Sequence, residues 1–187
     1  MHRQEKVDFY YKNKIKDFGI VIDNFADPHN VAAISRTADG LGVEKVYLYY
    51  TYNKVPDLKT VGKKSSSTAN KWIKFEQIKD LNSFVNEKKK EGWTIIGADE
   101  CTGAENLTEF KFPGKCLLVM GAEHGGISPE LRKVCDSFVF IPMLGMVESY
   151  NVSVAAGMFM YELFRQKGKG LVLRKRSKNT LSRSINR

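Results

Sequence analysis

The sequence predicts an α/β fold in which a mostly parallel sheet is flanked by helices. Short apolar runs typical of buried strands alternate with helical patterns along the chain, and no internal repeat is present. Of the 187 residues, 42% are hydrophobic, which supplies the core of one medium-sized domain and excludes a disordered chain. No apolar run approaches the ~18 residues of a membrane span, and residues 1–14 are too charged for a signal peptide, so we expect a cytoplasmic protein.

The individual elements follow in chain order from their residue patterns. A short amphipathic extension over residues 1–17 precedes the domain, which we expect to span residues 18–166. Strands are predicted where apolar, β-branched and aromatic residues gather, over Phe18–Asp23, Val46–Tyr50, Trp72–Phe75, Thr94–Ala98, Cys116–Gly121 and Phe138–Ile141. Helices are predicted over Asn30–Leu41, Ile78–Lys90, Ser128–Val134 and Ser149–Gln166. The composition of Thr51–Ala69 predicts a mobile loop, and Glu100–Gly114 has no clear period and is predicted as a loop.

Residues suited to helix termini support three of these helices. Asn30 is a good N-cap, and Gly42 is a good stop for the same helix. Ser128 is the predicted N-cap of the third helix. Ser149 or Asn151 can cap the last helix.

Ligands of parallel sheets bind at the carboxyl ends of strands, which here directs attention to Ala98, Met120–Gly126 and Ile141–Tyr150. The last of these regions joins a hydrophobic loop to a helix start that is dense in polar groups. Exposed N–H groups and carbonyls at such a start suit a polar ligand of the size of adenosine. The alternative is a strand, a loop and a helix cap without a ligand.

The turn after the strand predicted over Cys116–Gly121 is rich in glycine. Gly121, Gly125 and Gly126 allow a ligand to approach the backbone closely, although their spacing matches neither a dinucleotide fingerprint nor a P-loop. Glu123 in this turn is a candidate functional carboxylate, and the alternative is a plain turn with an exposed acid. No role is assigned to the three histidines.

The helix predicted over Asn30–Leu41 contains Arg36 among alanine and isoleucine residues. Burying a guanidinium without an anionic partner is costly, so Arg36 either meets an anionic ligand or is exposed on an ordinary amphipathic helix. Asn30 and Arg36 are six residues apart, so they do not share a helical face if both lie inside the helix.

Basic residues are concentrated at the C-terminus. The net charge is +9, from 30 Lys and Arg against 21 Asp and Glu, and residues 167–187 hold basic residues and no acid, so the rest of the chain is nearly neutral. Such a segment is either an arm that binds RNA or DNA or a solvated tail, and composition alone favours neither.

The three cysteines, Cys101, Cys116 and Cys135, include no C-x-x-C pair. This pattern argues against a disulfide framework and against a zinc site. We therefore predict buried free thiols and no metal.

Taken together and in this order, three stretches resemble the motifs of the SpoU (TrmH) family of RNA 2′-O-methyltransferases in the SPOUT superfamily. The stretches are Asn30–Gly42, Gly121–Ser128 and Ile141–Ala155. The third is similar to the tRNA branch that modifies the D-loop guanosine at position 18. The resemblance implies a C-terminal deep trefoil knot, an S-adenosylmethionine pocket built by that knot, and a homodimer with the site near its interface.

The resemblance also implies roles for particular residues. Arg36 corresponds to the catalytic arginine and Asn30 to its positioning neighbour, and the remaining catalytic motif positions are Glu123, Ser149 and Asn151. The cofactor pocket is expected to be lined, largely through main-chain groups, by Ala98, Gly121, Ile141 and Tyr150. Tyr150 departs from the family, which usually has leucine there. No metal is expected, because the methyl donor's leaving group departs neutral.

A family member of this kind needs to bind RNA, which gives the basic segment at 167–187 a partner. The residues expected to touch tRNA phosphates are Arg174, Lys175, Arg176, Lys178 and Arg183, with Lys12, Lys14 and Lys16 as helpers. The motifs describe the chemistry rather than the RNA, so rRNA or another tRNA position is the alternative substrate. A catalytically silent RNA-binding protein on the same fold is a further alternative, against which the intact motif residues argue.

Overall fold

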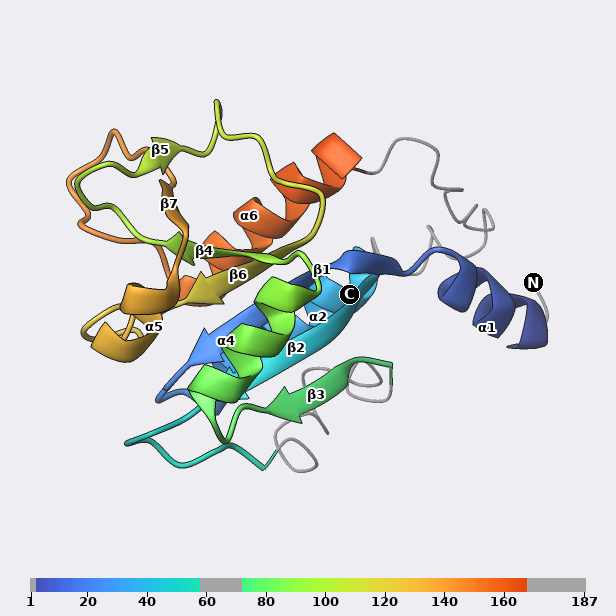
Figure 1. Cartoon of the computed structure of the whole chain (residues 1–187). Helices are drawn as coiled ribbons and strands as arrows, with labels where there is room; N and C mark the ends of the chain where they lie inside the picture. The colour runs from blue at the N-terminus through green and yellow to red at the C-terminus, as the bar shows by residue number, and fades with distance from the viewer. Residues whose placement is uncertain (1–2, 58–71, 168–187) are drawn as a thin grey trace.

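The computed structural model describes residues 3–57 and 72–167 of the chain. Its centre is a seven-stranded sheet with the order β3-β2-β1-β6-β4-β7-β5, and every pair of neighbouring strands is parallel (Figure 1). The predicted α/β class and the mostly parallel sheet are therefore confirmed. No helix within the described ranges is long and apolar enough to cross a bilayer.

The strands lie close to the predicted segments. They are β1 (Ile15–Asp23), β2 (Val43–Tyr49), β3 (Lys74–Gln77), β4 (Thr94–Ala98), β5 (Glu105–Asn106), β6 (Cys116–Met120) and β7 (Ser137–Phe140). The first strand includes the last three residues of the predicted N-terminal extension. The two-residue β5 lies inside the predicted loop 100–114, because this short segment pairs with β7 at the edge of the sheet. Most of the predicted loop 51–69 lies outside the described residues.

The helices are α1 (Arg3–Lys12), α2 (Pro28–Gly40), α4 (Leu81–Lys90), α5 (Pro129–Val134) and α6 (Val152–Lys167). The prediction that Asn30 caps α2 is wrong. Asp27 is the N-cap, because its side chain accepts a hydrogen bond from the backbone N–H of His29 at 2.8 Å. Pro28 begins the helix. Proline lacks a backbone N–H, and at the first helical position this group would have no acceptor within the helix.

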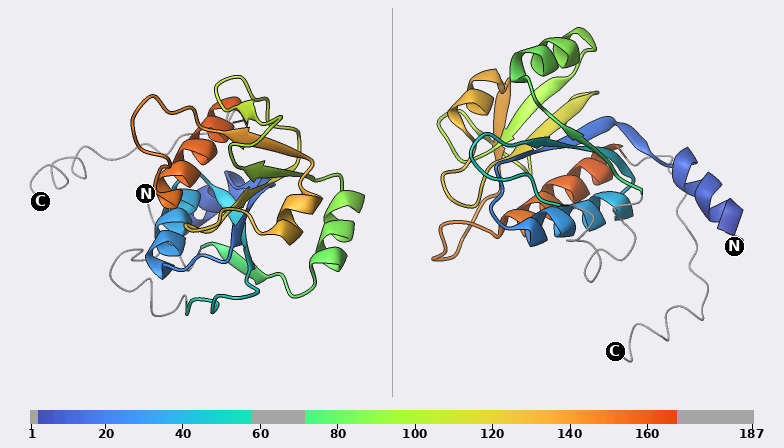
Figure 2. Two further views of the ribbon diagram at one scale, coloured as in Figure 1. Left: turned by 90° about the vertical axis from the view of Figure 1, so that its left-hand side faces the viewer. Right: turned by 90° about the horizontal axis from the view of Figure 1, so that it is seen from below.

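The sheet separates two layers of helices, as the second view of Figure 2 shows: α2 and α6 cover one face, while α4 and α5 cover the other. The alternation of side chains along each strand produces this arrangement. In β1, Ile20 and Ile22 face the core under α2 and α6, whereas Val21 faces the core under α4 and α5. In β6, Leu118 shares the first core and Leu117 the second.

The order of the strands creates a switch point at the centre of the sheet. From β1 the chain moves outward to β2 and β3. The later strands, β4 to β7, form the other half of the sheet, in which β6 is the strand that lies beside β1. At such a point the loops leave neighbouring strands in opposite directions, so a crevice opens at the carboxyl ends of those strands. In this protein β1 and β6 lie on either side of this point, and they end at Asp23 and Met120.

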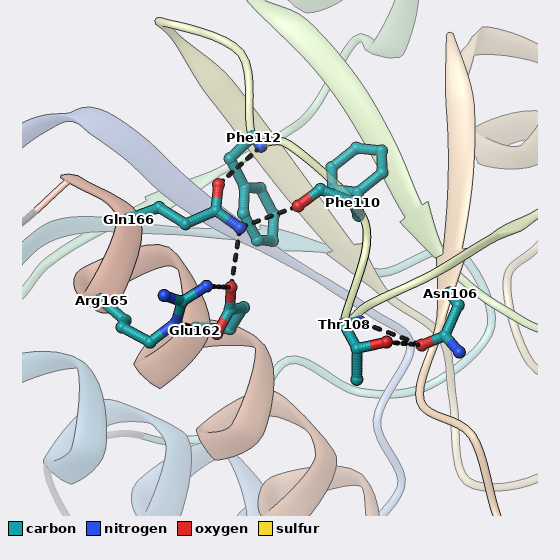
Figure 3. A network of polar contacts seen from close by, with 7 residues as sticks. All are labelled: Asn106, Thr108, Phe110, Phe112, Glu162, Arg165 and Gln166. Carbon is teal, nitrogen blue, oxygen red and sulfur yellow. Dashed lines mark hydrogen bonds and ion pairs between the residues drawn. The ribbon is translucent and has the colours of Figure 1, made fainter.

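The end of α6 is fastened to the segment that joins β5 to β6 (Figure 3). The side-chain amide of Gln166 donates to the carbonyl of Phe110 at 2.8 Å and accepts from the backbone N–H of Phe112 at 3.0 Å. Glu162 accepts two hydrogen bonds from the Arg165 guanidinium and one from Gln166. This network holds the last turn of α6 against the loop.

The same network makes Glu162 a source of acid sensitivity. The hydrogen bonds from Arg165, together with that from Gln166, lower the pKa of Glu162 to about 2 although partial burial opposes the shift. A carboxyl whose pKa is depressed in the folded state stabilises the fold above its unfolded pKa, and this contribution disappears as the pH falls through the folded pKa. We expect Glu162→Gln to lose less stability than the wild type between about pH 4.5 and 2, measured by urea unfolding at a series of pH values. Equal losses of stability in the variant and the wild type would contradict this expectation. The matched control is Glu105→Gln, which replaces an exposed glutamate on β5.

Candidate active site

A cavity of about 390 Å³ lies at the carboxyl ends of β4, β6 and β7. Its walls include the last residues of these strands, Ala98, Met120 and Phe140, and the loops that follow them. The structure brings together in this cavity seven of the residues that the sequence predicts as site residues: Ala98, Gly121, Glu123, Ile141, Ser149, Tyr150 and Asn151. Segments far apart in the chain therefore meet at the edge of the sheet where ligands of parallel sheets bind.

Gly121 allows the loop after β6 to turn back on itself. The backbone N–H of Ala122 donates to the carbonyl of Gly126 at 2.9 Å, which closes the turn. A Cβ atom at position 121 would lie 2.3 Å from the carbonyl carbon of Gly126 and 2.4 Å from the nitrogen of Ile127. Because these neighbours are backbone atoms, they cannot give way as a flexible side chain would, and only glycine fits here.

A chain of hydrogen bonds joins the three motif segments. The Glu123 carboxylate accepts from the Asn30 amide at 2.6 Å and from the backbone N–H of Ala26 at 3.1 Å. The Asn30 oxygen accepts in turn from the Asn151 amide at 3.3 Å. The Asn151 oxygen accepts from the backbone N–H of Ser153 at 2.9 Å and so caps α6. Asn30 thus does not line the cavity itself, but it connects two residues that do.

Two further residues that position this site follow directly from the end of β1, and the sequence analysis did not single them out. Asp23 is wholly buried and accepts from the backbone N–H of Ser128 at 2.6 Å, which ties β1 to the start of α5. Burial raises the pKa of Asp23, and hydrogen bonds from Ser128 and Asn24 limit the rise. Asn24 has a left-handed backbone with φ of 52°, and its oxygen accepts from the backbone N–H of Thr51 at 2.8 Å. A polar Asp-Asn pair at the end of an apolar strand was the signal for both.

Ser128 is the N-cap of α5, as predicted, but its side chain makes no capping hydrogen bond. Its backbone N–H is instead held by Asp23. The backbone of this N-cap is therefore held by a carboxylate at the end of β1 rather than by its own side chain.

Arg36 is exposed on α2 and is not among the residues that line the cavity. Six residues separate it from Asn30, which is about 9 Å along a helix and a different helical face. Asn30 faces the interior, whereas Arg36 lies on the outer surface of α2. The structure of one chain thus brings Asn30 to the site but leaves Arg36 outside the cavity.

The predicted RNA-binding lysines have two kinds of surroundings. Lys12 and Lys16 are exposed. Lys14 is half-buried and donates to the carbonyls of Val43 at 3.2 Å and Trp72 at 3.1 Å, and burial lowers its pKa. Its ammonium therefore faces the backbone rather than solvent, unlike the prediction. The remaining predicted residues, Arg174, Lys175, Arg176, Lys178 and Arg183, lie outside the described residues.

The three cysteines are free thiols, as predicted. Cys116 is buried in β6, whereas Cys101 and Cys135 are only partly buried, so the prediction of burial holds for the first alone. Burial raises the pKa of Cys116 to about 11 and that of Cys135 to about 12. These two thiols are therefore protonated and unreactive at neutral pH.

Comparison with known proteins gives this arrangement a family context. The profile of the SpoU rRNA Methylase family matches residues 17–161. The tRNA (guanosine(18)-2′-O)-methyltransferase of Aquifex aeolicus is 34% identical over 152 residues, which cover 81% of this chain and 71% of the relative. The crystal structure of the A. aeolicus TrmH/SpoU tRNA modifying enzyme has a TM-score of 0.78 at 29% identity and covers 98% of this chain and 92% of that one. The SpoU methyltransferase AviRb from Streptomyces viridochromogenes, solved with the cofactor AdoMet, has a TM-score of 0.71 at 29% identity and covers 86% of this chain and 62% of that one.

The matched region contains the cavity and all three motif segments, from Asn30 to Ala155. Sequence, fold and the convergence of the motif residues agree with one another. On these grounds the chain belongs to the SpoU rRNA methylase family.

Proposed function

We propose that this protein transfers a methyl group from S-adenosylmethionine to the 2′-hydroxyl of a guanosine in tRNA, at position 18 of the D-loop. The observation that carries the proposal is a chain of hydrogen bonds that joins the three motif segments: Asn30 of the first segment is bonded to Glu123 of the second and to Asn151 of the third. Glu123 and Asn151 line the cavity at the carboxyl ends of β4, β6 and β7. The A. aeolicus relative that bears this activity in its name supports the choice of RNA and position. Because tRNA is the proposed substrate, the cytoplasm is the proposed location.

The cavity fits the methyl donor in size and in chemistry. A volume of about 390 Å³ lies in the range of small-molecule sites, which is about 300–1,000 Å³. Met120, Ile141 and Phe159 offer apolar surface for an adenine ring, and Ala98 and Gly121 bring the main chain to the wall of the cavity. When bound, the donor supplies an electrophilic methyl group. We propose Ala98, Gly121, Ile141 and Tyr150 as the residues that hold it.

The protein itself has to position the ribose. A 2′-hydroxyl is a poor nucleophile, so holding it in line with the methyl group supplies much of the rate. Arg36 orients the ribose and its phosphate through its positively charged guanidinium and stabilises the charge that develops. Glu123, Asn30 and Asn151 fix the loops around the cavity through their hydrogen bonds.

A homodimer belongs to this proposal, because it would bring Arg36 to a site that one chain leaves incomplete. The loop before α6 exposes Leu144 and Met146 completely, and Val154, Met158 and Tyr161 form an exposed apolar stripe along α6. Exposed apolar surface of this extent is typical of an interface. The helix α6, which carries this stripe, packs against α2, which carries Arg36.

We expect sedimentation equilibrium at micromolar concentrations to give the mass of two chains. Tyr161→Glu, which places a charge in the stripe, is expected to shift the equilibrium toward monomers and to reduce methylation while leaving each chain folded. A wild-type monomer with full methylation activity would contradict the shared site.

The deep C-terminal knot is the remaining structural part of the proposal. Two observations support it: the non-sequential strand order, with β6 between β1 and β4, and the attachment of α6 to the segment between β5 and β6 by Gln166. A knot of this kind would use that segment as the loop through which the end of the chain passes.

The basic segment after α6 is proposed as an arm for tRNA phosphates, with Lys12 and Lys16 as exposed helpers. Deleting residues 168–187 leaves α6 and the contact of Lys167 with the carbonyl of Gly114 intact. We expect the truncated protein to bind tRNA more weakly and with a flatter dependence on salt, since each lost phosphate contact removes counterion release. Equal affinities at low and high salt would reject the arm.

The function itself is tested by incubating the protein with S-adenosylmethionine and tRNA transcripts and mapping 2′-O-methyl groups by resistance to alkaline hydrolysis. We expect one modified position, guanosine 18, and no product on a transcript with 2′-deoxyguanosine at that position. Methylation of rRNA fragments or of another tRNA position would keep the chemistry and overturn the proposed substrate. No transfer to any RNA, despite a folded protein, would overturn the function.

A further inference from the structure

The cavity of the candidate active site is lined by acidic side chains. Asp99, Glu100, Glu123 and Glu148 contribute to its walls, and none of the lining residues is lysine, arginine or histidine. We call these four residues the acidic rim. A cleft lined by one sign of charge focuses its field on a bound ligand, so the rim acts on the whole cavity and not only on atoms in contact with it.

Only one carboxylate of the acidic rim is paired with a cation among the described residues. Asp99 forms an ion pair with Arg132 of α5. Glu123 accepts its hydrogen bonds from uncharged donors, the amide of Asn30 and a backbone N–H, so its charge is stabilised but not cancelled. Glu100 and Glu148 are exposed lining residues and take part in no salt bridge within residues 3–57 and 72–167.

Charge is also the main difference between the methyl donor and the product that it leaves behind. S-adenosylmethionine has a sulfonium, an ammonium and a carboxylate, and so carries one net positive charge. S-adenosylhomocysteine has lost the methyl group together with the sulfonium charge and is neutral overall. Hydrogen bonds and apolar contacts treat the two molecules almost alike, whereas a negative field stabilises the donor alone.

We infer that Glu148 and Glu100 are specificity-determining residues that make this cavity prefer the cationic methyl donor over its neutral product. This inference rests on the proposed function and adds to it a reason why the product leaves after each transfer. Both carboxylates are exposed and screened, so each is expected to contribute about two- to fivefold to the preference.

Isothermal titration calorimetry on the full chain measures this preference as the Kd of S-adenosylhomocysteine divided by that of S-adenosylmethionine. In Glu148→Gln we expect the ratio to fall about two- to fivefold, and in the double variant with Glu100→Gln to fall further. Glutamine keeps the size of the side chain, so a merely lost contact would weaken both ligands equally and leave the ratio unchanged. Glu109→Gln, at an exposed glutamate outside the cavity, is the matched control and should not change the ratio.

Two further measurements separate charge from shape. Sinefungin, an analogue with an amine in place of the methylated sulfonium, should lose affinity in the variants as the donor does. In the wild type the preference should shrink at 0.5 M salt, because rim charges are screened. An unchanged ratio in both variants overturns the inference while the binding of both ligands still supports the proposed function. Failure of the wild type to bind either ligand overturns the proposed function and the inference together.

Discussion

Replacing Gly121 with alanine is expected to destabilise the protein by about 2–3 kcal/mol and to weaken binding of S-adenosylmethionine at least about tenfold. The added Cβ would lie 2.3 and 2.4 Å from backbone atoms of Gly126 and Ile127, so the turn after β6 has to open. Opening this turn displaces Glu123 and breaks the hydrogen bond from Ala122 to Gly126. The site and the fold should therefore suffer together.

Urea unfolding and calorimetric titration with the donor measure the two effects of Gly121→Ala. Gly114→Ala is the matched control, because nothing lies within 4 Å of a Cβ built at that exposed glycine. The control should keep the wild-type stability and donor affinity. A Gly121→Ala protein as stable as the control, with unchanged affinity, would show that the tight turn is not needed for the cavity.

Arg36→Ala is expected to lower the single-turnover rate of RNA methylation by about 100-fold or more while leaving the affinity for the methyl donor unchanged. The rate should fall because the guanidinium orients the ribose-phosphate. The donor affinity should not change because Arg36 does not line the cavity. This separation of rate from donor binding distinguishes Arg36 from the residues around the cavity.

Arg36→Lys tests whether the guanidinium itself is required. Lysine keeps the positive charge but loses the planar, two-pronged donor geometry that matches a phosphate, so we expect only a small part of the rate to return. Lys90→Ala removes an exposed charge at the end of α4, on the opposite face of the sheet, and serves as the control. A wild-type rate in Arg36→Lys would rule out a specific role for the guanidinium.

The sequence was most informative where one local signal determined the structure. The continuous apolar run of β6 predicts a buried strand. Strands of a parallel sheet are covered by helices on both faces, so their side chains are apolar on both sides. The residues after β4, β6 and β7 were expected to meet because parallel strands end at a common edge, and the cavity is there. The identity of the reaction came from the family motifs and not from periodicity.

Local signals failed where several competed or where the decisive contact was distant. Asn30 and Asp27 are both good capping residues, and Pro28 after Asp27 was the signal that favours the earlier start. Asn30 is instead held by Glu123, which is 93 residues away in the chain. The buried bond between Asp23 and Ser128 spans 105 residues, and no pattern within either segment specifies such a pairing.

The central claim is that the methyl donor binds in the cavity at the ends of β4, β6 and β7. A crystal structure of the protein with S-adenosylhomocysteine tests it most directly. We expect the ligand between Gly121, Ile141 and Tyr150, with Arg36 of a second copy facing the site. A ligand bound elsewhere, with this cavity empty, would show that the cavity is not the donor site.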